Sequence, residues 1–537
     1  MAQTYFLIEA INIEANVFDT DQLSIIRGSS FLLKQAILHI KNNFPSLHPI
    51  STGASTGLFR KINDDITDTA LQDKIVKHLR EDPNYQLFTF IVEHCQANEL
   101  LQAKQQLLSQ LRISQMQSIG IAPDNTATHQ DFPCELDGKR YASTNLKATR
   151  QVQTSNNNEK KLSDSIYQRL AQGRKLKNDY YFKELKDKYQ KEIEQIGLKK
   201  HQFSQDLETL ANHENYAKLH NKIAVIYLDG NSFSKKQRDF IQKEKEQSQE
   251  QAQQDFDTLI QNKRNDYLIN LLQNMVCNID NHFPDAIADA QNPNELPIIR
   301  LETLLWGGDE LTFVVPAWLG FEVLQNFYQE VEMKPEGEKK AFTHAAGIVF
   351  CHAKSPIRLM RQLANALADH NKNNYPDGRE HNYWDYIILE SIDYPTNNNI
   401  DDFFTQQYAS LGIEKDRKPL RPAINWHKNK ETLNKLIQDE QLSKGQLYKI
   451  LQQVDKTEDS TASWDDLNQT TYTANTAQEK QEQQLIKISK GKLTNKLPKL
   501  AKDIFDLDIN HPKQRLMFWV HLIETWDYLL PQSKGNQ

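Results

Sequence analysis

The chain has 537 residues, with 64 Lys or Arg against 71 Asp or Glu, a formal net charge of −7. This length predicts roughly three to four domains, and so mild a charge excludes a generally basic nucleic-acid coat. Four scattered cysteines are too few for a disulfide scaffold or a four-cysteine zinc site. We find no signal-peptide pattern and no apolar run of membrane length, so we expect a cytoplasmic protein in a reducing compartment.

Residues 1–115 alternate strand-like and helix-like patterns, which predicts a first α/β unit. Expected in chain order are a strand at 4–13, a helix at 31–40, a glycine-bearing stretch at 51–58, a strand at 85–92 and a helix at 98–111. Residues 116–215 form a basic linker region with a helix over 163–197. Between 139 and 200 it holds 16 Lys or Arg against 7 Asp or Glu, which indicates either a solvated helix face or a contact with nucleotide or RNA phosphates.

Residues 216–392 predict a second α/β unit. It begins with a buried strand at 223–228, followed by a charged, Gln-rich stretch at 232–254 that we interpret as an insertion or a protruding helix. Expected next are a helix at 256–283, strands at 297–306 and 311–315, a helix at 318–331, a strand at 343–351, a helix at 356–371 and a strand at 383–389. This order is the split ferredoxin-like arrangement, which is the palm architecture of many polymerases and nucleotide cyclases.

Residues 393–537 predict an α-helical C-terminal domain. Amphipathic patterns lie at 428–438, 445–454 and 516–530. The stretch 455–484 is polar and nearly free of aliphatic residues, so we expect a flexible link there. The fold class is therefore α+β, with two ferredoxin-like units, a helical linker region and a helical C-terminal domain.

Two short motifs carry the chemistry. Asp229-Gly230-Asn231-Ser232 follows a buried strand, and Gly307-Gly308-Asp309-Glu310 joins two apolar strands. Each alone is an ordinary turn sequence. In a ferredoxin-like sheet, however, the strands that precede and follow these motifs are neighbours. We therefore expect Asp229 and Asp309 to point to one spot.

Two carboxylates at one spot repel each other unless a cation lies between them. Magnesium or manganese prefers oxygen ligands and also binds triphosphate. Two such ions about 4 Å apart can activate an attacking hydroxyl and stabilise the leaving pyrophosphate. We assign Asp229, Asp309 and the backbone of Gly230 as metal ligands, and Asp229, Asp309 and Glu310 as the catalytic set.

The triphosphate needs backbone donors and cations around it. Glycines let a nucleotide lie against bare backbone, and the N–H groups that open the helix after Asp229 can hold phosphate. Ordinary surface lysines are the alternative for the basic residues. The expected nucleotide contacts are Gly230, Asn231, Ser232, Phe233, Gly307, Gly308, Lys354 and Lys372.

These motifs resemble the active palm of the large polymerase-like subunit of type III CRISPR effectors, a cyclic oligoadenylate synthase related to GGDEF diguanylate cyclases. Four matches occur in family order. They are Thr20–Ser30, which is similar to the signature of the first palm, Leu228–Lys235, Trp306–Glu310, and Ala345–Val349 with His352–Ile357. Pro133–Gly138 looks like a remnant of the zinc element between the two palms.

The resemblance implies a degenerate first palm, an active second palm and a role in antiviral defence. Ser51–Ser55 of the first palm contains no acid, Glu310 replaces the last Asp of the usual GGDD motif, and Cys134 alone remains of the zinc cysteines, so zinc is not expected. The chain starts directly at the palm, so we expect a stand-alone or reduced variant without the HD nuclease domain.

The expected function is a metal-dependent nucleotidyltransferase or cyclase. It would join nucleoside triphosphates, ATP first among them, into a cyclic mono- or oligonucleotide messenger and release pyrophosphate, with two Mg²⁺ or Mn²⁺ ions as cofactors. Two alternatives stay open: a catalytically silent scaffold of a CRISPR-like effector complex, and a cyclase that makes a 3′,5′-cyclic monophosphate. Expected partners are a nucleoside triphosphate, RNA or effector-complex proteins, and a second copy of the chain, but no membrane.

Overall fold

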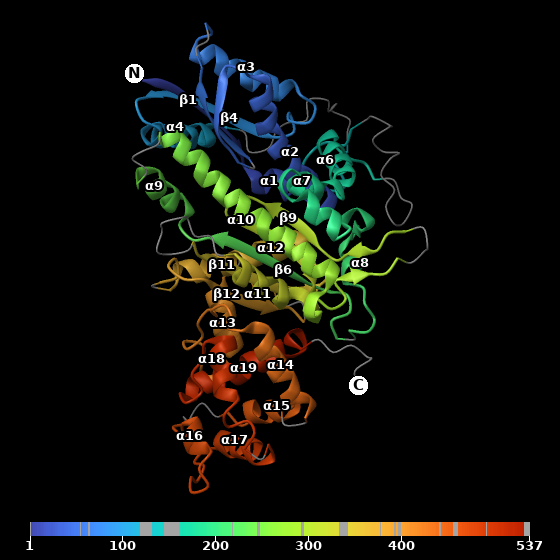
Figure 1. The fold of residues 1–537 in the computed structure, drawn as a ribbon, viewed down its shortest axis with the longest axis vertical. Helices are drawn as coiled ribbons and strands as arrows, with labels where there is room; N and C mark the ends of the chain where they lie inside the picture. The colour runs from blue at the N-terminus through green and yellow to red at the C-terminus, as the bar shows by residue number, and fades with distance from the viewer. Residues whose placement is uncertain are drawn as a thin grey trace.

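The computed structural model describes residues 2–530 except 54, 63–64, 119–131, 144–159, 217, 244–247, 291–294, 332–341, 376, 391–393, 396–398, 440–441, 455–459 and 490. The molecule is elongated, with the first α/β unit at one end, the second in the middle and the C-terminal helices at the other end (Figure 1). Among the described residues, no helix is long and apolar enough to cross a membrane.

The first unit is a four-stranded sheet in the order β2-β3-β1-β4. One face of β1 packs on α2 and α3, and the other on α4. The strand expected at 85–92 starts only at Thr89, because residues from Asp82 to Phe88 form turns closed by their own backbone hydrogen bonds. The elements are β1 (Gln3–Ile11), α1 (Ile13–Val17), α2 (Leu23–Asn43), β2 (Leu47–Thr52), β3 (Thr56–Lys61), α3 (Asp68–Glu81), β4 (Thr89–Ala97) and α4 (Leu100–Gln117).

The linker region contains two helices, α6 (Asp164–Lys175) and α7 (Asp179–Gln195). Helix α6 crosses α2 at backbone contact. A Cβ atom on Gly28 would lie 1.9 Å from the carbonyl oxygen of Arg169, and one on Gly173 would lie 1.7 Å from that of Ser24. Only glycine fits at either position, which explains why a glycine follows the arginine in the segment Thr20–Ser30.

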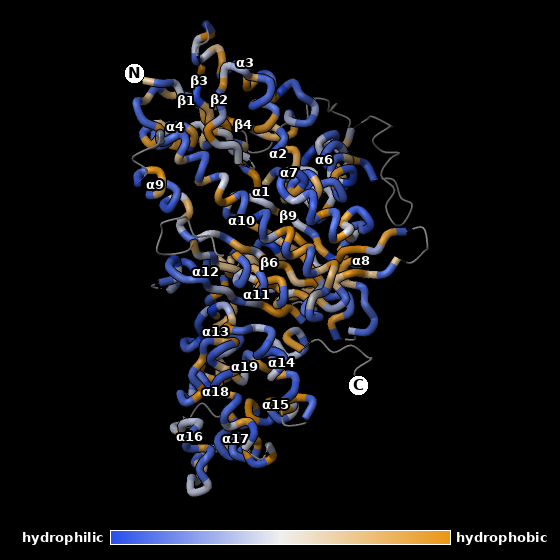
Figure 2. Tube along the Cα trace, in the orientation of Figure 1, coloured by the Kyte–Doolittle hydropathy of each residue, from blue (hydrophilic) through white to orange (hydrophobic). Residues whose placement is uncertain are grey.

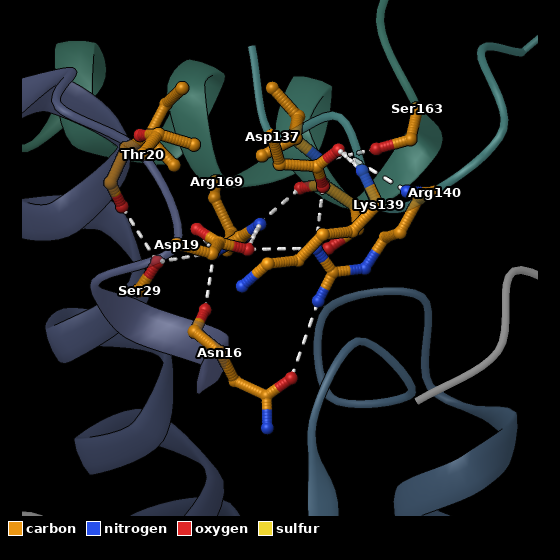
Figure 3. Close-up of polar contacts among 12 residues, drawn as sticks. Asn16, Asp19, Thr20, Ser29, Asp137, Lys139, Arg140, Ser163 and Arg169 are labelled. Carbon is orange, nitrogen blue, oxygen red and sulfur yellow. Dashed lines mark hydrogen bonds and ion pairs between the residues drawn. The ribbon is translucent and has the colours of Figure 1, made fainter. Parts of the chain in front are cut away.

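A buried ion cluster ties the linker to the first unit (Figure 3). Arg169 and Arg140 both donate to Asp19 Oδ2, at 2.8 Å and 2.7 Å, and Arg140 also donates to Asp137 Oδ2 at 2.6 Å. Burial acts to raise the pKa of Asp19, but the two guanidinium groups outweigh it and hold that pKa below its usual value. The segment around Cys134 that we expected to be a zinc remnant is thus fastened by charge pairs.

This cluster also changes the interpretation of the basic linker. Arg140, Arg169 and Lys177 are buried, so part of the positive excess is structural and belongs neither to a solvated face nor to a phosphate contact. Lys147 and Arg150 lie outside the described residues.

The second unit has the sheet order β12-β11-β6-β10-β9. Strand β6 lies antiparallel to both β10 and β11, and β12 is parallel to β11. Helix α10 packs on one face of the sheet and α12 on the other. Figure 2 shows the hydrophobic residues concentrated around this sheet. The sheet and its helices are β6 (Lys222–Gly230), α9 (Phe233–Lys243), α10 (Gln249–Cys277), β9 (Glu302–Trp306), β10 (Glu310–Pro316), α11 (Gly320–Glu330), β11 (His344–His352), α12 (Ile357–Asn373) and β12 (Tyr383–Ile388).

A small side sheet in the order β5-β8-β7 lies beside this unit. It uses part of the strand expected at 297–306, which is therefore divided between β8 and β9. Its elements are β5 (Gln202–Phe203), α8 (Leu207–Ala211), β7 (Ile287–Ala288) and β8 (Ile298–Ile299).

The described part of the stretch 232–254 is mainly helical, in agreement with the second of the two alternatives. It forms α9 and the start of α10, and it buries Phe233, Ile241 and Ala252. Its polar residues contact the first unit, because Tyr5 Oη donates to Glu250 Oε1 at 3.1 Å and Gln254 Nε2 donates to the carbonyl of Pro49 at 3.0 Å. The glutamines thus serve an interface between the two units.

The C-terminal region is helical, as expected, and the mixed α/β character of the rest is confirmed. The expected flexible link at 455–484 is wrong for the described part of it: Trp464 is fully buried, and Glu482 pairs with buried Arg515 at 3.2 Å. Capping boxes at Ser463 and Thr476 begin two of its helices. The helices are α13 (Ile400–Tyr408), α14 (Trp426–Gln438), α15 (Lys444–Gln452), α16 (Trp464–Leu467), α17 (Ala477–Ile488), α18 (Leu497–Phe505) and α19 (Pro512–Leu529).

Candidate functional site

The two acidic motifs meet at one edge of the second sheet. Glu310, the first residue of β10, lies directly opposite Asp229 near the end of β6. The Gly230 N–H donates to the carbonyl of Asp309 at 3.1 Å. Opposed residues of an antiparallel pair project to the same face, so Asp229 and Glu310 share the face covered by α12. Asp309 lines a cavity on the α10 side.

The three carboxylates are close enough to perturb one another electrostatically. Burial raises the pKa of Glu310 to about 7, and the charges of Asp229 and Asp309 add to the rise. Burial also raises the pKa of Asp309, again with a contribution from Asp229. Half-buried carboxylates that resist ionisation together provide a place where a cation is favoured.

Lys372 supplies a positive charge in this structure. It lies near the end of α12, is 6% exposed, and its Nζ contacts Asp229 Oδ2 directly. The same ammonium counteracts the pKa rises of Asp309 and Glu310. Lys372 thus lies at the acidic edge, where it contacts a carboxylate, and its expected contact with the triphosphate stays a prediction.

Lys354 does not reach the site. Strand β11 runs antiparallel to β6, so His344 lies opposite Gly230 while His352 lies opposite Lys222, at the other end of the sheet. Lys354 follows His352, and its Nζ lies 3.6 Å from Glu208 Oε1 on the surface. The expected triphosphate contact of Lys354 is therefore wrong, because the strand carries this residue away from the acids.

The loop after Asp229 is constrained more tightly than expected. A Cβ atom on Gly230 would meet the Phe233 ring at 2.3 Å and Asp309 Cβ at 2.9 Å, so only glycine fits. Asn231 is buried, and its Nδ2 donates to Thr343 Oγ1 at 3.0 Å and to the carbonyl of His381 at 2.9 Å. Ser232 has a φ of 57°, a left-handed conformation.

Three backbone N–H groups of the expected nucleotide contacts are already used. The Gly230 N–H bonds to Asp309 as described, and the Asn231 N–H donates to the carbonyl of Thr343 at 2.8 Å. In the second motif, the Gly307 N–H donates to the carbonyl of Glu310 at 2.8 Å. A Cβ on Gly308 would meet no atom within 4 Å, so bare backbone is accessible at this glycine.

The acidic residues at this edge fit magnesium or manganese only if water and substrate complete the coordination shell. Among the described residues, no three His, Cys, Asp or Glu side chains group closely enough to hold a metal by themselves. Magnesium usually binds through one or two carboxylates, with water and substrate phosphates completing the shell. Asp229 and Asp309 provide two carboxylates, the number that this pattern needs.

A cavity of about 220 Å³ adjoins Asp309. Its walls come from the hairpin of the second unit, from α9 and α10, and from Ser51 to Gly53 and Lys34 of the first unit. The sequence reasoning missed most of these residues, Arg264 among them, and named Trp306 only as the first residue of the second motif. A signal was present for Arg264, because it is placed four residues after Ile260 and four before Leu268, on the buried face of α10.

Comparisons with known proteins find similarity in fold alone. No family model and no curated protein matches the chain. An apo Csm1–Csm4 cassette is 10% identical and covers 97% of this chain and 70% of that chain, with a TM-score of 0.45. A Csm1–Csm4 cassette in complex with cA4 is 11% identical and covers 76% of this chain and 58% of that one, with a TM-score of 0.40.

Csm1 of T. onnurineus gives 11% identity, 76% and 57% coverage, and a TM-score of 0.40. The chain thus spans less than two thirds of the length of two of these three neighbours. They are large subunits of type III CRISPR complexes, the family whose motifs the sequence resembles. Since every one of these TM-scores is below 0.5, we transfer no residue role from them.

Proposed function

We propose that the chain is a metal-dependent nucleotidyltransferase that converts nucleoside triphosphates, ATP first among them, into a cyclic nucleotide or oligonucleotide and pyrophosphate. The observation that carries this proposal is the meeting of the two acidic motifs at one sheet edge, where Asp229 lies opposite Glu310, Asp309 lines a cavity and the pKa of Glu310 is raised to about 7. A purely structural hairpin has no need of carboxylates placed so that Asp229 and Asp309 add to the rise in the pKa of Glu310.

Asp229, Asp309, Glu310 and Lys372 have different roles in this proposal. Asp229 and Asp309 hold the divalent cation or cations, which, when bound, lower the pKa of the attacking 3′-hydroxyl and neutralise the leaving pyrophosphate. Glu310 supports the same site from beside Asp229. Lys372 moves its ammonium from Asp229 to the triphosphate as the nucleotide arrives, because both are anionic partners within reach of one flexible side chain.

The test is pyrophosphate release from ATP with Mg²⁺ or Mn²⁺, followed by mass spectrometry of the product. A cyclic oligonucleotide supports the messenger synthase, whereas a 3′,5′-cyclic monophosphate supports the simple cyclase. The proposal fails if wild-type protein releases no more pyrophosphate than the Asp309→Ala variant.

One observation favours the silent-scaffold alternative: Lys372 already neutralises Asp229. In that case the site would bind nucleotide without turnover, and the chain would act as a subunit of a CRISPR-like effector complex. Co-purifying RNA with a strongly salt-dependent affinity, together with absent pyrophosphate release, would support this view.

A further inference from the structure

Arg264 is a buried cation without a protein counter-ion. It lies on α10, is 8% exposed, and its guanidinium lies over the Trp306 ring at 5.1 Å from the ring centroid. Within the described part of the chain it forms no ion pair, and its Nε donates no hydrogen bond. A buried charge without a partner is costly, so this arrangement needs a reason.

The neighbouring carboxylates do not supply the missing partner. Glu184 is bonded to Lys34 of the first unit. Asp309 lies within electrostatic range of Arg264 but does not pair with it. A guanidinium does not lose its proton in a protein, so the positive charge of Arg264 persists.

Arg264 lines the 220 Å³ cavity beside Asp309. A guanidinium that lines an open space and forms no ion pair among the described residues provides a place for an anion. Phosphate oxygens are the anionic acceptors that the planar guanidinium fork matches best.

We propose that Arg264 binds a phosphate group of the nucleotide held beside Asp309, on the side opposite to Lys372. Helix α10 covers one face of the sheet and α12 the other, so the two cations approach the acidic edge from opposite faces. The proposal rests on the proposed function for the identity of the ligand. It goes further in assigning a second phosphate-binding cation and in giving the cavity between the units a role.

The experiment measures binding of ATP with Mg²⁺, and of adenosine, by calorimetry, and thermal stability without ligand. Arg264→Met should weaken ATP binding about 10- to 100-fold, the range of a lost charge-assisted contact, and leave adenosine binding unchanged. Its melting temperature without ligand should equal or exceed that of the wild type, since an unpaired buried charge is removed. Arg264→Lys should retain part of the ATP affinity.

Arg300 is a matched control. It is 4% exposed and lies over Trp318 at 5.5 Å, but its Nη1 donates to the carbonyl oxygens of Thr209 and Leu210 at 3.1 Å and 2.8 Å. Arg300→Met should therefore lower the melting temperature without ligand and leave the ATP affinity unchanged.

The outcomes separate this proposal from the proposed function. Equal ATP affinities of the wild type and Arg264→Met, or equal losses for ATP and adenosine, overturn the phosphate contact. If the wild type binds ATP through Arg264 but releases no pyrophosphate, the phosphate contact stands and the enzyme proposal falls. A wild type that binds no ATP overturns both.

Discussion

The two α/β units have related sheets but differ at one hairpin. In the second unit, the Gly230 N–H donates to the carbonyl of Asp309 at 3.1 Å; in the first, the Ala10 N–H donates to the carbonyl of Ser55 at 2.9 Å. Both bonds join the central strand to the start of the neighbouring hairpin strand. The backbone arrangement at the site is therefore present twice.

The side chains on that backbone differ. Glu9 lies opposite Thr56 in the first unit, where the second has Asp229 opposite Glu310. One acid thus remains in the first unit, near Arg112 at 3.7 Å, and both hairpin acids are replaced by hydroxyls. The two units therefore share a backbone arrangement, and the carboxylates distinguish the site of the second unit from its counterpart in the first. The first unit contributes a wall of the cavity.

The largest expected effect is on turnover. Asp309→Asn should reduce pyrophosphate release by about 10³-fold or more, as removal of a catalytic group commonly does, because the proposed metal ligand is lost. Glu9→Gln in the first unit is the matched control and should leave the rate within about twofold. Comparable losses for the two variants would mean that both units carry chemistry.

The next largest effect is the difference in ATP affinity between substitutions at Lys372 and at Lys354. Lys372→Met should weaken ATP binding about 10- to 100-fold, in the range of a lost charged contact. Lys354→Met should leave it unchanged, because Lys354 lies at the far end of the sheet beside Glu208. Calorimetric titration with ATP checks both, and an effect of Lys354→Met would contradict the described sheet register.

Glycine substitutions test the packing of the acidic edge. Gly230→Ala should lower the free energy of unfolding by about 1–3 kcal/mol, the usual cost of overpacking, because its Cβ would overlap the Phe233 ring at 2.3 Å. Gly308→Ala should cost much less, since a Cβ there meets no atom within 4 Å. Urea denaturation of both variants measures the difference; equal costs would contradict it.

A further expected effect is a pH dependence. The pKa of Glu310 is raised in the folded protein from 4.5 to about 7. Its contribution to stability is complete below the unfolded value of about 4.5 and is lost as the pH rises through about 7. The metal-free protein should therefore become less stable from about pH 5 to about pH 8, and Glu310→Gln should flatten this slope. A slope that the substitution leaves unaltered would place the titration elsewhere.

The sequence predicted the parts of the site that depend on strand neighbours. Asp229 lies near the end of one apolar strand and Asp309 directly precedes another, and the order of these strands along the chain determines that they pair, so the meeting of the two motifs at one edge followed from topology. That both side chains point to one spot stays a prediction. The position of Lys354 could not be inferred from its distance along the chain to the motifs, because it depends on the direction of β11. Lys372, one helix later, returns to the same edge as the acids.

Predictions from composition were wrong where buried polar residues bond to one another. The Gln-rich stretch 232–254 and the polar stretch around Trp464 contain few aliphatic residues. Both nevertheless form hydrogen bonds to distant parts of the chain. For Arg140 and Arg169 the composition of the linker indicates a solvated face or a phosphate contact, but both residues donate to buried Asp19. Such partners are far away in sequence, so local pattern does not reveal them.

The most direct test of the central claim is anomalous diffraction from crystals grown with Mn²⁺ and a non-hydrolysable ATP analogue. We predict manganese peaks within ligand distance of the Asp229 and Asp309 carboxylates, with Lys372 moved from Asp229 to the triphosphate. An acidic edge that holds no manganese, with Lys372 still paired to Asp229 and the nucleotide bound elsewhere or absent, would contradict the account.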